Sequence, residues 1–490
     1  MTTRSGGART VMPPLRPVEV EVPVQSIARF EELLDPADHA RQLEVVSGAS
    51  RRLRGRVVWH VNSTARGGGV AEMMGPLIGF ARGLGVDARW LVIAGTPEFF
   101  RITKRLHNML HGSPGDGGDL GRRERGLYER VLAANAVELE ALVRAGDIVV
   151  LHDPQTAGLV PVLRREGAIV VWRSHIGHDD QDDPEVRRGW GFLEPYLREA
   201  HATVFSRQAY VPDCCDAGRS RIIRPSIDPF SPKNQDLSED VVRAILVHVG
   251  LVEGPPGPAL PVFHRHDGSP ERVDRGVDIV RVGRAPSWDA PLVVQASRWD
   301  RLKDHMGVME GFARLDPAAT GDARLVLAGP AVTGVADDPE GPAVLSEVLA
   351  AWRELPHERR HRVQIAALPM VDVHENAAIL NALQRHASVI VQKSLQEGFG
   401  LTVTEAMWKA RPVLASDVGG IRDQIDDGRD GVLLPDPADL DGFAAALGRL
   451  LADPAAARRL GEAARERVRR DFLGLRHLAD YAELMEEVTT

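Results

Sequence analysis

The sequence predicts an α/β protein made of two Rossmann-like domains that face each other across a cleft. The chain has 490 residues, which is too long for one hydrophobic core and suits two domains of roughly 200 residues each. In both halves, short β-branched runs alternate with amphipathic segments, a pattern typical of a parallel sheet covered by helices on both faces. A polar, proline-rich stretch separates the two halves.

The first half is expected to form one domain over residues 36–225. Residues 1–35 before it lack the apolar centre of a secretion signal and are expected to be a disordered leader. The strand candidates of this half lie at 56–63, 88–95, 147–153, 168–176 and 202–207. The helices expected between them lie at 71–85, 124–145 and 185–200.

The second half repeats this alternation over residues 291–464, after a connection and insertion at 226–290. Its strand candidates lie at 291–298, 323–329, 362–368, 387–394 and 412–417. Helices are expected at 304–315, 343–354, 374–384 and 402–410. Because ligands of open α/β sheets bind beyond the carboxyl ends of the strands, motifs at those ends are the first candidates for a site.

Composition and charge argue against several classes of function. The formal net charge is −9, and no Lys/Arg run is long enough for a nucleic-acid footprint, so we expect no nucleic-acid partner. No apolar stretch approaches the ~20 residues of a membrane span. The two cysteines, Cys214 and Cys215, are adjacent and are not expected to bridge each other, and no C-x-x-C metal spacing occurs. A cytoplasmic protein without a metal site is the expectation.

The most informative stretch runs from Gln392 to Gly420 and contains two glutamates, Glu397 and Glu405. Carboxylates accept hydrogen bonds from sugar and ribose hydroxyls. Between the two, a glycine-containing turn leads into a helix, whose first N–H groups lack internal partners and favour a diphosphate. These N–H groups belong to Gly398, Phe399, Gly400 and Leu401. The stretch indicates a nucleotide-sugar site, although spacing alone also fits capping and surface glutamates.

Two cations and two glycines follow other predicted strands. Arg298 and Lys303, in S-R-W-D-R-L-K-D-H, are expected at a strand end and at the start of the next helix. Converging there, they would neutralise a diphosphate leaving group. Gly68 and Gly69 follow the first strand, where glycine lets the backbone come close to a ligand. Taken alone, these residues also fit solvated surface charges and a flexible turn.

The remaining site candidates follow two strands of the first half. His175, in V-V-W-R-S-H-I-G-H, follows a predicted strand, where a lone histidine is more often structural than catalytic. Asp153 and Gln155, in H-D-P-Q, carry oxygens that can bind acceptor hydroxyls, and they can equally cap a helix. These three residues form the candidate acceptor site.

Two sets of motifs carry a resemblance to a known family. The run E-G-F-G-L-T-x-x-E-A-M followed by P-V-L-A-S-D-V-G-G resembles the donor site of retaining glycosyltransferases of family 4, which have the GT-B architecture. The strings V-N-S-T-A-R-G-G-G-V-A-E-M-M, F-F-R-I-T-K-R-L-H-N-M-L-H-G and Q-A-S-R-W-D-R-L-K-D-H-M-G-V resemble those of trehalose glycosyltransferring synthases. The resemblance covers residues 40–485, with an interruption in the middle insertion.

The resemblance implies a reaction and a set of roles. A nucleoside-diphosphate glucose, with ADP, UDP or GDP, would transfer glucose to free glucose and form α,α-trehalose with retained configuration, without a cofactor or an obligatory metal. Glu397 would hold the donor sugar and Glu405 its ribose, while His175 would contact the transferred sugar. Arg298 and Lys303 would bind the diphosphate, with the backbone of Gly68, Gly69 and residues 398–401. Arg298, Lys303, Glu397 and His175 are thus the expected catalytic residues.

The resemblance also bears on the assembly and leaves alternatives open. A C-terminal helix at 465–488 would pack back on the first domain, and a homodimer is compatible with the family. A trehalose phosphorylase that uses glucose 1-phosphate shares this scaffold. A family 4 transferase with another acceptor fits the donor half, and a catalytically idle sugar-nucleotide sensor is a third alternative.

Overall fold

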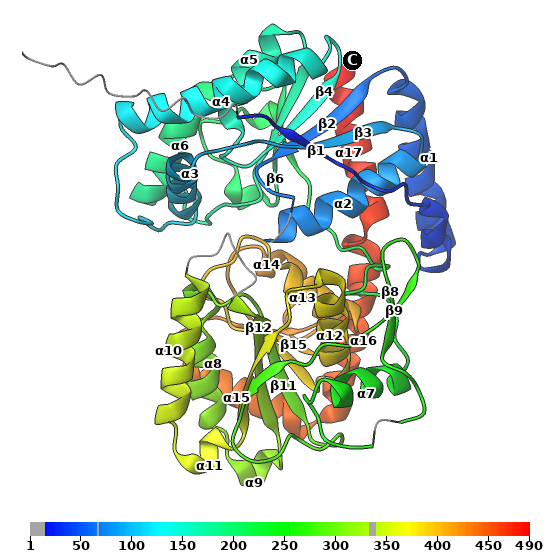
Figure 1. The fold of residues 1–490 in the computed structure, drawn as a ribbon, viewed down its shortest axis with the longest axis vertical. Coiled ribbons are helices and arrows are strands. Elements are labelled where there is room, and N and C mark those ends of the chain that lie inside the picture. Colours follow the sequence, from blue (N-terminus) through cyan, green and yellow to red (C-terminus); the bar gives the residue numbers. More distant parts are fainter. Residues whose placement is uncertain (1–14, 66–67, 256, 333–339) are drawn as a thin grey trace, which may run out of the picture.

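The computed structural model describes residues 15–65, 68–255, 257–332 and 340–490. These residues form two α/β domains, each built on its own sheet, which lie end to end in Figure 1. The first domain contains the N-terminal strands and the second contains the strands from β10 onward. A small antiparallel pair, β8 (Val262–His264) and β9 (Pro270–Arg272), stands apart from both sheets.

The first sheet has the strand order β1-β3-β2-β4-β5-β6-β7 over the described residues. Its strands are β1 (Val18–Val20), β2 (Val57–Asn62), β3 (Asp87–Val92), β4 (Ile148–His152), β5 (Ile169–Arg173), β6 (Ala202–Phe205) and β7 (Ser220–Ile222). All neighbours pair in parallel except β1, which runs antiparallel to β3. The central strand β4 is buried along its whole length, as the continuous apolar run I-V-V-L predicts.

The second sheet has the order β10-β13-β12-β11-β14-β15-β16 over the described residues. Its strands are β10 (Asp278–Val280), β11 (Leu292–Ala296), β12 (Arg324–Pro330), β13 (Val363–Leu368), β14 (Val389–Gln392), β15 (Val413–Ser416) and β16 (Val432–Leu434). Again one edge strand, β10, is antiparallel and the other pairs are parallel. The prediction of two Rossmann-like parallel-sheet domains is therefore confirmed.

Helices cover both faces of the sheets, and many begin at an Asp or Ser cap. The described helices of the first domain are α1 (Pro36–Arg52), α2 (Gly68–Gly83), α3 (Pro97–Met109), α4 (Arg122–Leu142), α5 (Val160–Arg165) and α6 (Pro184–Leu197). Those that follow are α7 (Glu239–His248), α8 (His305–Ala313), α9 (Pro317–Thr320), α10 (Gly341–Glu354), α11 (His357–Arg360), α12 (Val373–His386), α13 (Leu401–Trp408), α14 (Ile421–Gln424), α15 (Leu440–Ala452), α16 (Pro454–Asp471) and α17 (Gly474–Thr489). Asp35 and Asp183 each cap a helix whose first residue is proline, a favoured start because proline lacks only an N–H that would be unpaired.

The described part of the expected leader is structured. β1 pairs with β3, and the 3-10 helix Ile27–Glu32 buries Phe30 completely. The Phe30 ring centroid lies 5.0 Å from that of Phe80, in the core of the first domain. The expectation of disorder was therefore wrong for residues 15–35, because a three-residue strand and one anchoring aromatic leave no periodic signal. Residues 1–14 lie outside the described residues.

The C-terminal segment also differs in detail from the expected single helix at 465–488. The helix α16 packs against α13 and α15 in the second domain, and the chain then bends at Phe472 and Leu473. The helix α17 packs against α1 and α2 of the first domain, as Figure 1 shows in red beside blue. At the bend, the Ile227 N–H donates to the Phe472 carbonyl at 2.9 Å, so the two chain crossings between the domains lie side by side.

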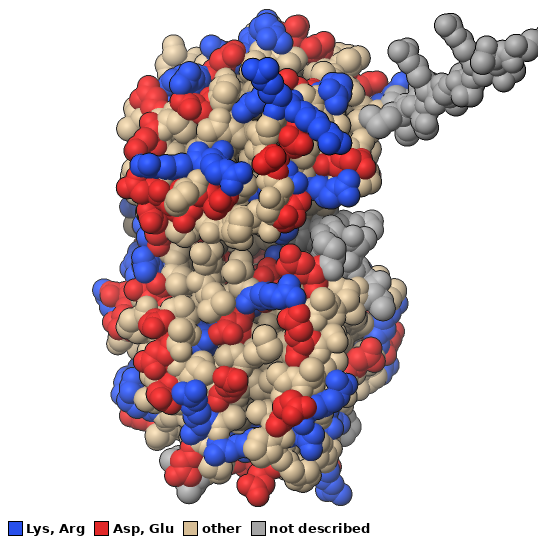
Figure 2. Space-filling view, turned by 90° about the vertical axis from the view of Figure 1, so that its left-hand side faces the viewer, with Lys and Arg blue, Asp and Glu red and all other residues tan. Residues whose placement is uncertain are grey.

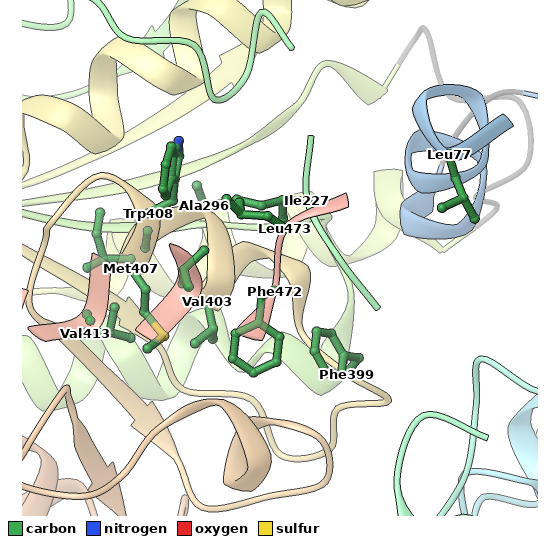
Figure 3. Packing of buried hydrophobic residues seen from close by; sticks show 14 of the residues in the cluster. Leu77, Ile227, Ala296, Phe399, Val403, Met407, Trp408, Val413, Phe472 and Leu473 are labelled. Carbon is green, nitrogen blue, oxygen red and sulfur yellow. The ribbon is translucent and has the colours of Figure 1, made fainter. Parts of the chain in front are cut away.

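A hydrophobic cluster runs through this crossing into the second domain. Figure 3 shows Ile227 and Leu473 together, with Phe472 beside Phe399 and with Val403, Met407 and Trp408 of α13 to their left. The Phe399 and Phe472 ring centroids are 5.9 Å apart. The loop that carries Phe399 is thereby anchored to the core.

The surface mixes charges of both signs. On the face shown in Figure 2, Lys and Arg side chains alternate with Asp and Glu over both domains. Among the described helices, none is long and apolar enough to cross a membrane.

Candidate functional site

The run that begins at Glu397 and resembles a glycosyltransferase donor site is called the donor motif below. It lies at the carboxyl end of β14, which ends at Gln392, and leads into α13. Gly400 is the residue before the helix and has a φ of 88°, a left-handed conformation that glycine adopts without strain. A Cβ atom added there would lie 3.0 Å from Cγ of Glu397, so the turn is also tight. Phe399 is buried and Leu401 is the first residue of the helix. The unpaired N–H groups of this helix start are thus set at one edge of the sheet.

Glu397 and Lys303 form an ion pair in the middle of this site. Lys303 Nζ lies 2.5 Å from Glu397 Oε2, and both side chains are mostly buried. Ser394 Oγ donates to the same carboxylate oxygen at 3.2 Å. The pair arises because β11 and β14 are parallel neighbours, so the loops at their carboxyl ends meet.

Lys303 lies in the 3-10 turn Arg301–Lys303, just before α8 rather than at its start. Its carbonyl accepts a hydrogen bond from Gln295 Nε2 at 2.7 Å, which fixes the turn to strand β11. Arg298 follows the same strand, and its guanidinium is half-exposed, 3.4 Å from Asp300. The two predicted cations therefore belong to one loop, with Lys303 seated in the site and Arg298 nearer to solvent.

Glu405 lies one turn further along α13 and is buried, at 2% exposure. Lys233 Nζ lies 3.0 Å from its Oε1, while its Oε2 has no hydrogen-bond partner among the described residues. Burial raises the pKa of Glu405, and the charge of Lys233 opposes that rise. The structure therefore places the two glutamates of the motif in different surroundings, with Glu397 in the turn and Glu405 in the helix.

The first domain contributes the start of α2 at the carboxyl end of β2. The helix begins at Gly68, and Gly67 lies outside the described residues. A Cβ atom on Gly69 would lie 2.8 Å from Cδ1 of Leu401. The starts of α2 and α13 therefore lie close together across the domain junction.

His175 also lies at this junction, at the end of β5, but with its backbone toward the donor motif. A Cβ atom on Gly398 would lie 3.3 Å from the His175 carbonyl oxygen. The His175 ring instead bonds His152, with 2.9 Å between Nε2 and Nδ1, and His152 bonds His60 at 3.1 Å. Burial holds the pKa of His175 well below its usual value. A sugar contact by the His175 side chain stays a prediction.

The two other acceptor candidates lie beside His175. Asp153 Oδ1 accepts the His175 N–H at 2.8 Å, and its backbone has an unusual φ of 62°. Burial raises the pKa of Asp153 to about 7. Gln155 Oε1 is buried and has no hydrogen-bond partner among the described residues. The structure thus joins Asp153 to His175, and Gln155, two positions after Asp153, has a buried acceptor atom that is unsatisfied among the described residues.

Several residues at the site were not found from the sequence. Tyr210 donates to the carbonyls of Glu397 and Gly398, at 3.1 and 2.8 Å. His111, after α3, has its Cε1 3.4 Å from the Cβ position of Gly398. Burial lowers the pKa of His111 to about 4. The only signal for His111 was its place in the string H-N-M-L-H-G, and a lone tyrosine gives none.

A second group of residues ties the two domains together next to the donor motif. Arg207 of the first domain donates to Asp179 at 2.7 Å and to the carbonyl of Gly419 at 2.6 Å. Arg422 of the second domain donates to the other oxygen of Asp179 at 2.9 Å. These contacts, with those of Tyr210, hold the donor loop against the first domain.

The described residues contain no group of three or more His, Cys, Asp or Glu side chains that could hold a metal ion. The charges that line the junction are side chains and helix starts. A cation beside a helix start is chemically suited to an anion, and the carboxylates of Glu397 and Glu405 are suited to accept hydrogen bonds from hydroxyls.

Comparison with known families divides the chain in the same way as the two sheets. Residues 60–212 match the family described as trehalose synthase, N-terminal domain. Residues 284–467 match the family described as glycosyl transferases group 1. The first match contains His175, Asp153 and Gln155, and the second contains Lys303 and both glutamates.

Solved structures with the same fold include enzymes of disaccharide synthesis. The chain is similar to an Escherichia coli trehalose-6-phosphate protein bound with UDP-2-fluoro glucose, with a TM-score of 0.65, 14% identity and coverage of 88% of this chain and 99% of that one. It is also similar to an α,α-trehalose-phosphate synthase (UDP-forming) from Burkholderia vietnamiensis, with a TM-score of 0.63, 17% identity and coverage of 89% and 97%. These likenesses support the GT-B architecture.

Curated relatives match over nearly the whole chain. The trehalose synthase of Rubrobacter xylanophilus is 35% identical, over 89% of this chain and 92% of the relative. The trehalose synthase of Pyrococcus horikoshii is 32% identical, over 91% and 94%. A trehalose phosphorylase of Pleurotus pulmonarius is 27% identical, over 83% of this chain but 54% of the relative. The chain is a glycosyltransferase and belongs to the trehalose synthase family.

Proposed function

We propose that the protein is a retaining glucosyltransferase that joins the glucose of a nucleoside-diphosphate glucose to free glucose, forming α,α-trehalose. The observation that carries this proposal is the pair Lys303–Glu397 beside the start of α13, which lies close to the start of α2. Such a site offers charge to a diphosphate and a carboxylate to the sugar next to it. The relatives named trehalose synthase support the choice of product.

In the proposed reaction, positioning and leaving-group stabilisation replace an enzyme nucleophile. The bond between C1 of the donor glucose and the diphosphate oxygen breaks, and the anomeric hydroxyl oxygen of the acceptor glucose bonds to C1 on the same face. The acceptor proton passes to a phosphate oxygen of the departing diphosphate. Lys303, Arg298 and the helix starts stabilise the negative charge that develops on the leaving group.

The substrates would divide between the two domains. Glu397 would hold hydroxyls of the donor glucose, and Glu405 the ribose diol. His175, Asp153 and Gln155 would surround the acceptor glucose, where the unsatisfied Gln155 Oε1 is available to a hydroxyl. Donor and acceptor would therefore meet where His175 passes Gly398. We further propose a cytoplasmic setting, a homodimer as the assembly to be tested, and no requirement for a metal.

Product analysis with the purified protein tests this proposal. Glucose is offered with ADP-, UDP- and GDP-glucose in turn, with and without EDTA. We expect trehalose and the free nucleoside diphosphate in equal amounts, with one preferred base and no effect of EDTA. Consumption of donor without trehalose would contradict the acceptor assignment.

A trehalose phosphorylase is the second candidate, because the Pleurotus relatives carry that name. It would split trehalose with inorganic phosphate and release glucose 1-phosphate without any nucleotide. The same preparation, incubated with trehalose and phosphate, separates the two functions. We expect no glucose 1-phosphate from this reaction.

A further inference from the structure

Lys233 lies on the segment that joins the two domains, and its ammonium group contacts both of them. Lys233 Nζ is 3.0 Å from Oε1 of Glu405 in α13 of the second domain. It is also 2.9 Å from Oε2 of Glu72 in α2 of the first domain. The Lys233 side chain is mostly buried, whereas the Glu72 side chain is 53% exposed. One cation thus joins the buried glutamate of the donor motif to the helix whose start faces it.

The backbone around Lys233 is fixed by the second domain. The Trp408 indole N–H donates to the carbonyl of Asn234 at 3.1 Å, and Asn381 Nδ2 donates to the carbonyl of Pro232 at 3.0 Å. Both hydrogen bonds are buried, so the position of the turn does not depend on a substrate. The ammonium group is therefore held next to Glu405 in advance.

The charged groups around Glu405 influence the pKa of its carboxyl group. Burial raises the pKa of Glu405, because a carboxylate away from water is disfavoured, and the charge of Lys233 opposes that rise. Burial also disfavours the ammonium of Lys233, but Glu405 and Glu72 together raise its pKa above the usual value. Lys409, one turn after Glu405, donates to the Glu405 carbonyl at 3.1 Å, and burial holds its pKa well below the usual value. Lys233 is thus the cation whose ammonium group contacts the Glu405 carboxylate directly, at 3.0 Å from Oε1.

The ion pair also sets the orientation of the carboxylate. Because Oε1 is bonded to Lys233, Oε2 is left as the acceptor, and it has no partner among the described residues. A buried carboxylate oxygen without a partner is a strong acceptor for a hydroxyl group. A ribose offers two adjacent hydroxyls, whereas a 2′-deoxyribose offers one.

We propose that Lys233 is a positioning residue for the donor: it keeps Glu405 ionised and turned so that Oε2 binds the ribose diol of the nucleotide sugar. This inference rests on the proposed function, in which Glu405 holds the donor ribose. Lys233 touches neither the sugar nor the diphosphate. Its loss therefore affects ribose recognition rather than the chemical step.

The test compares donors with ribose and with 2′-deoxyribose in wild type and variants. The donor is the ADP-, UDP- or GDP-glucose that supports trehalose synthesis, together with its 2′-deoxy analogue. For wild type we expect kcat/KM at least about tenfold higher with the ribose donor, since a hydrogen bond to a charged group contributes about 1.5–3 kcal/mol. In Lys233→Met we expect this ratio to fall to about one to three, with the ribose-donor KM raised about tenfold. The kcat and the KM for glucose should stay within about twofold of wild type.

Two further variants separate positioning from a structural role. Lys233→Arg keeps the charge, and we expect it to restore most of the ribose preference. Glu72→Gln removes only the exposed partner of Lys233, which contributes about 0–1 kcal/mol, so the donor KM should stay within about threefold of wild type. Lys233→Gln replaces the Met variant if thermal unfolding shows that the latter does not fold.

Three outcomes would overturn the inference. Lys233→Met with an unchanged ribose preference would show that Glu405 needs no fixed cation. A lower kcat of Lys233→Met together with altered KM values for both donor and glucose would indicate a purely structural bridge. An equal effect of Glu72→Gln on the donor KM would indicate the same. Wild type that makes trehalose without any ribose preference would remove the assignment of Glu405 but keep the proposed function. Absence of trehalose in wild type would instead contradict the proposed function itself.

Discussion

The division of work between Lys303 and Glu405 can be tested on single residues. Lys303 Nζ is placed beside the Glu397 carboxylate, where a diphosphate would leave, so Lys303→Met should lower kcat by about a hundredfold. Glu405 would bind only the ribose, so Glu405→Gln should raise the donor KM more than it lowers kcat. Steady-state kinetics with the donor varied at saturating glucose gives both values. Equal losses of kcat and donor affinity in both variants would contradict this division.

The buried carboxyl of Asp153 should make stability depend on pH. Burial raises its pKa in the folded protein to about 7, from 3.8 in the unfolded chain. Between these values the unfolded chain ionises and the folded protein does not, so the stability contributed by this group falls as the pH rises from about 4 to about 7. Asparagine cannot ionise, so the Tm of Asp153→Asn minus that of wild type should increase over this range and stay constant above it.

Differential scanning calorimetry between pH 4 and 8 measures that difference. Asp267→Asn is the matched control, because Asp267 is fully exposed and its hydrogen bonds from Ser269 lower its pKa. We expect no gain in Tm for the control as the pH rises. A flat difference for Asp153→Asn would show that Asp153 is ionised in the folded protein.

At the residue scale, site residues could be predicted from the sequence only where they lie close together along the chain. Glu397, Gly398 and Gly400 lie in one short motif, and the motif's order fixes their relation. Lys233 and Tyr210 reach the site from far away in the chain, through the fold, so spacing carries no trace of them. The ring of His175 points toward His152, which a histidine at a strand end does not reveal.

The donor loop, residues 393–400, packs against a second glycine-containing turn at Gly419. Gly419 has a φ of 50°, and a Cβ atom there would lie only 1.9 Å from the Glu397 carbonyl oxygen and 2.8 Å from Tyr210 Oη. Gly428 also has a positive φ, 73°, but nothing lies within 4 Å of its Cβ position. The two glycines therefore share a backbone conformation and differ in what lies next to them.

This difference gives a matched pair of substitutions. Gly428→Ala should cost about 1 kcal/mol, the penalty of a left-handed conformation for an alanine. Gly419→Ala should cost more, and it should also displace the loop that carries Glu397 and lower kcat/KM by at least about tenfold. Urea unfolding and trehalose synthesis measure the two effects. Equal losses in both variants would show that the contact with the Glu397 carbonyl can relax.

At the element scale, prediction succeeded where burial leaves a continuous apolar run. The expected strands at 147–153 and 362–368 correspond to β4 and β13, whose residues are almost all buried. The edge strands β1 and β10 were missed because three residues that pair only on one side need no apolar pattern. The helix α1 was missed although Asp35 and Pro36 form a favourable helix start.

Across the whole molecule, the last helix holds the first domain together through a buried arginine. Arg173 is fully buried and donates to Tyr481 at 2.7 Å and to His477 at 3.1 Å, both in α17. Tyr481→Phe removes one acceptor from a buried cation, so the free energy of unfolding should fall by about 1–3 kcal/mol. Urea unfolding at constant pH measures this change.

The control for this variant is an exposed contact of the same helix. Glu487 pairs with Arg221 of β7 at 2.7 Å, and the two side chains are 48% and 38% exposed. Glu487→Gln should therefore change the free energy of unfolding by less than about 1 kcal/mol. If Tyr481→Phe is no more destabilising than this control, the hydrogen bond of Arg173 to Tyr481 of α17 does not contribute to stability.

The two-domain architecture was predictable from the chain length and from the alternation of strands and helices. The bend that returns the C-terminal segment to the first domain was not. The sequence indicates a charged, helical tail, and the family resemblance alone suggested that it returns to the first domain. The bend at Phe472 depends on its pairing with Ile227, some 250 positions earlier in the chain by the residue numbers. Such a pairing leaves no local pattern.

That return has a consequence for biosynthesis. The start of α17 lies on the core of the first domain, where a Cβ atom on Gly474 would lie 3.4 Å from Cζ of Phe30. A ribosome makes Phe30 long before Gly474, so the apolar side of the first domain stays open until α17 has been made. The second domain contains its whole sheet before that moment. A chain that stops short of Gly474 therefore has the whole second sheet beside a first domain that lacks α17.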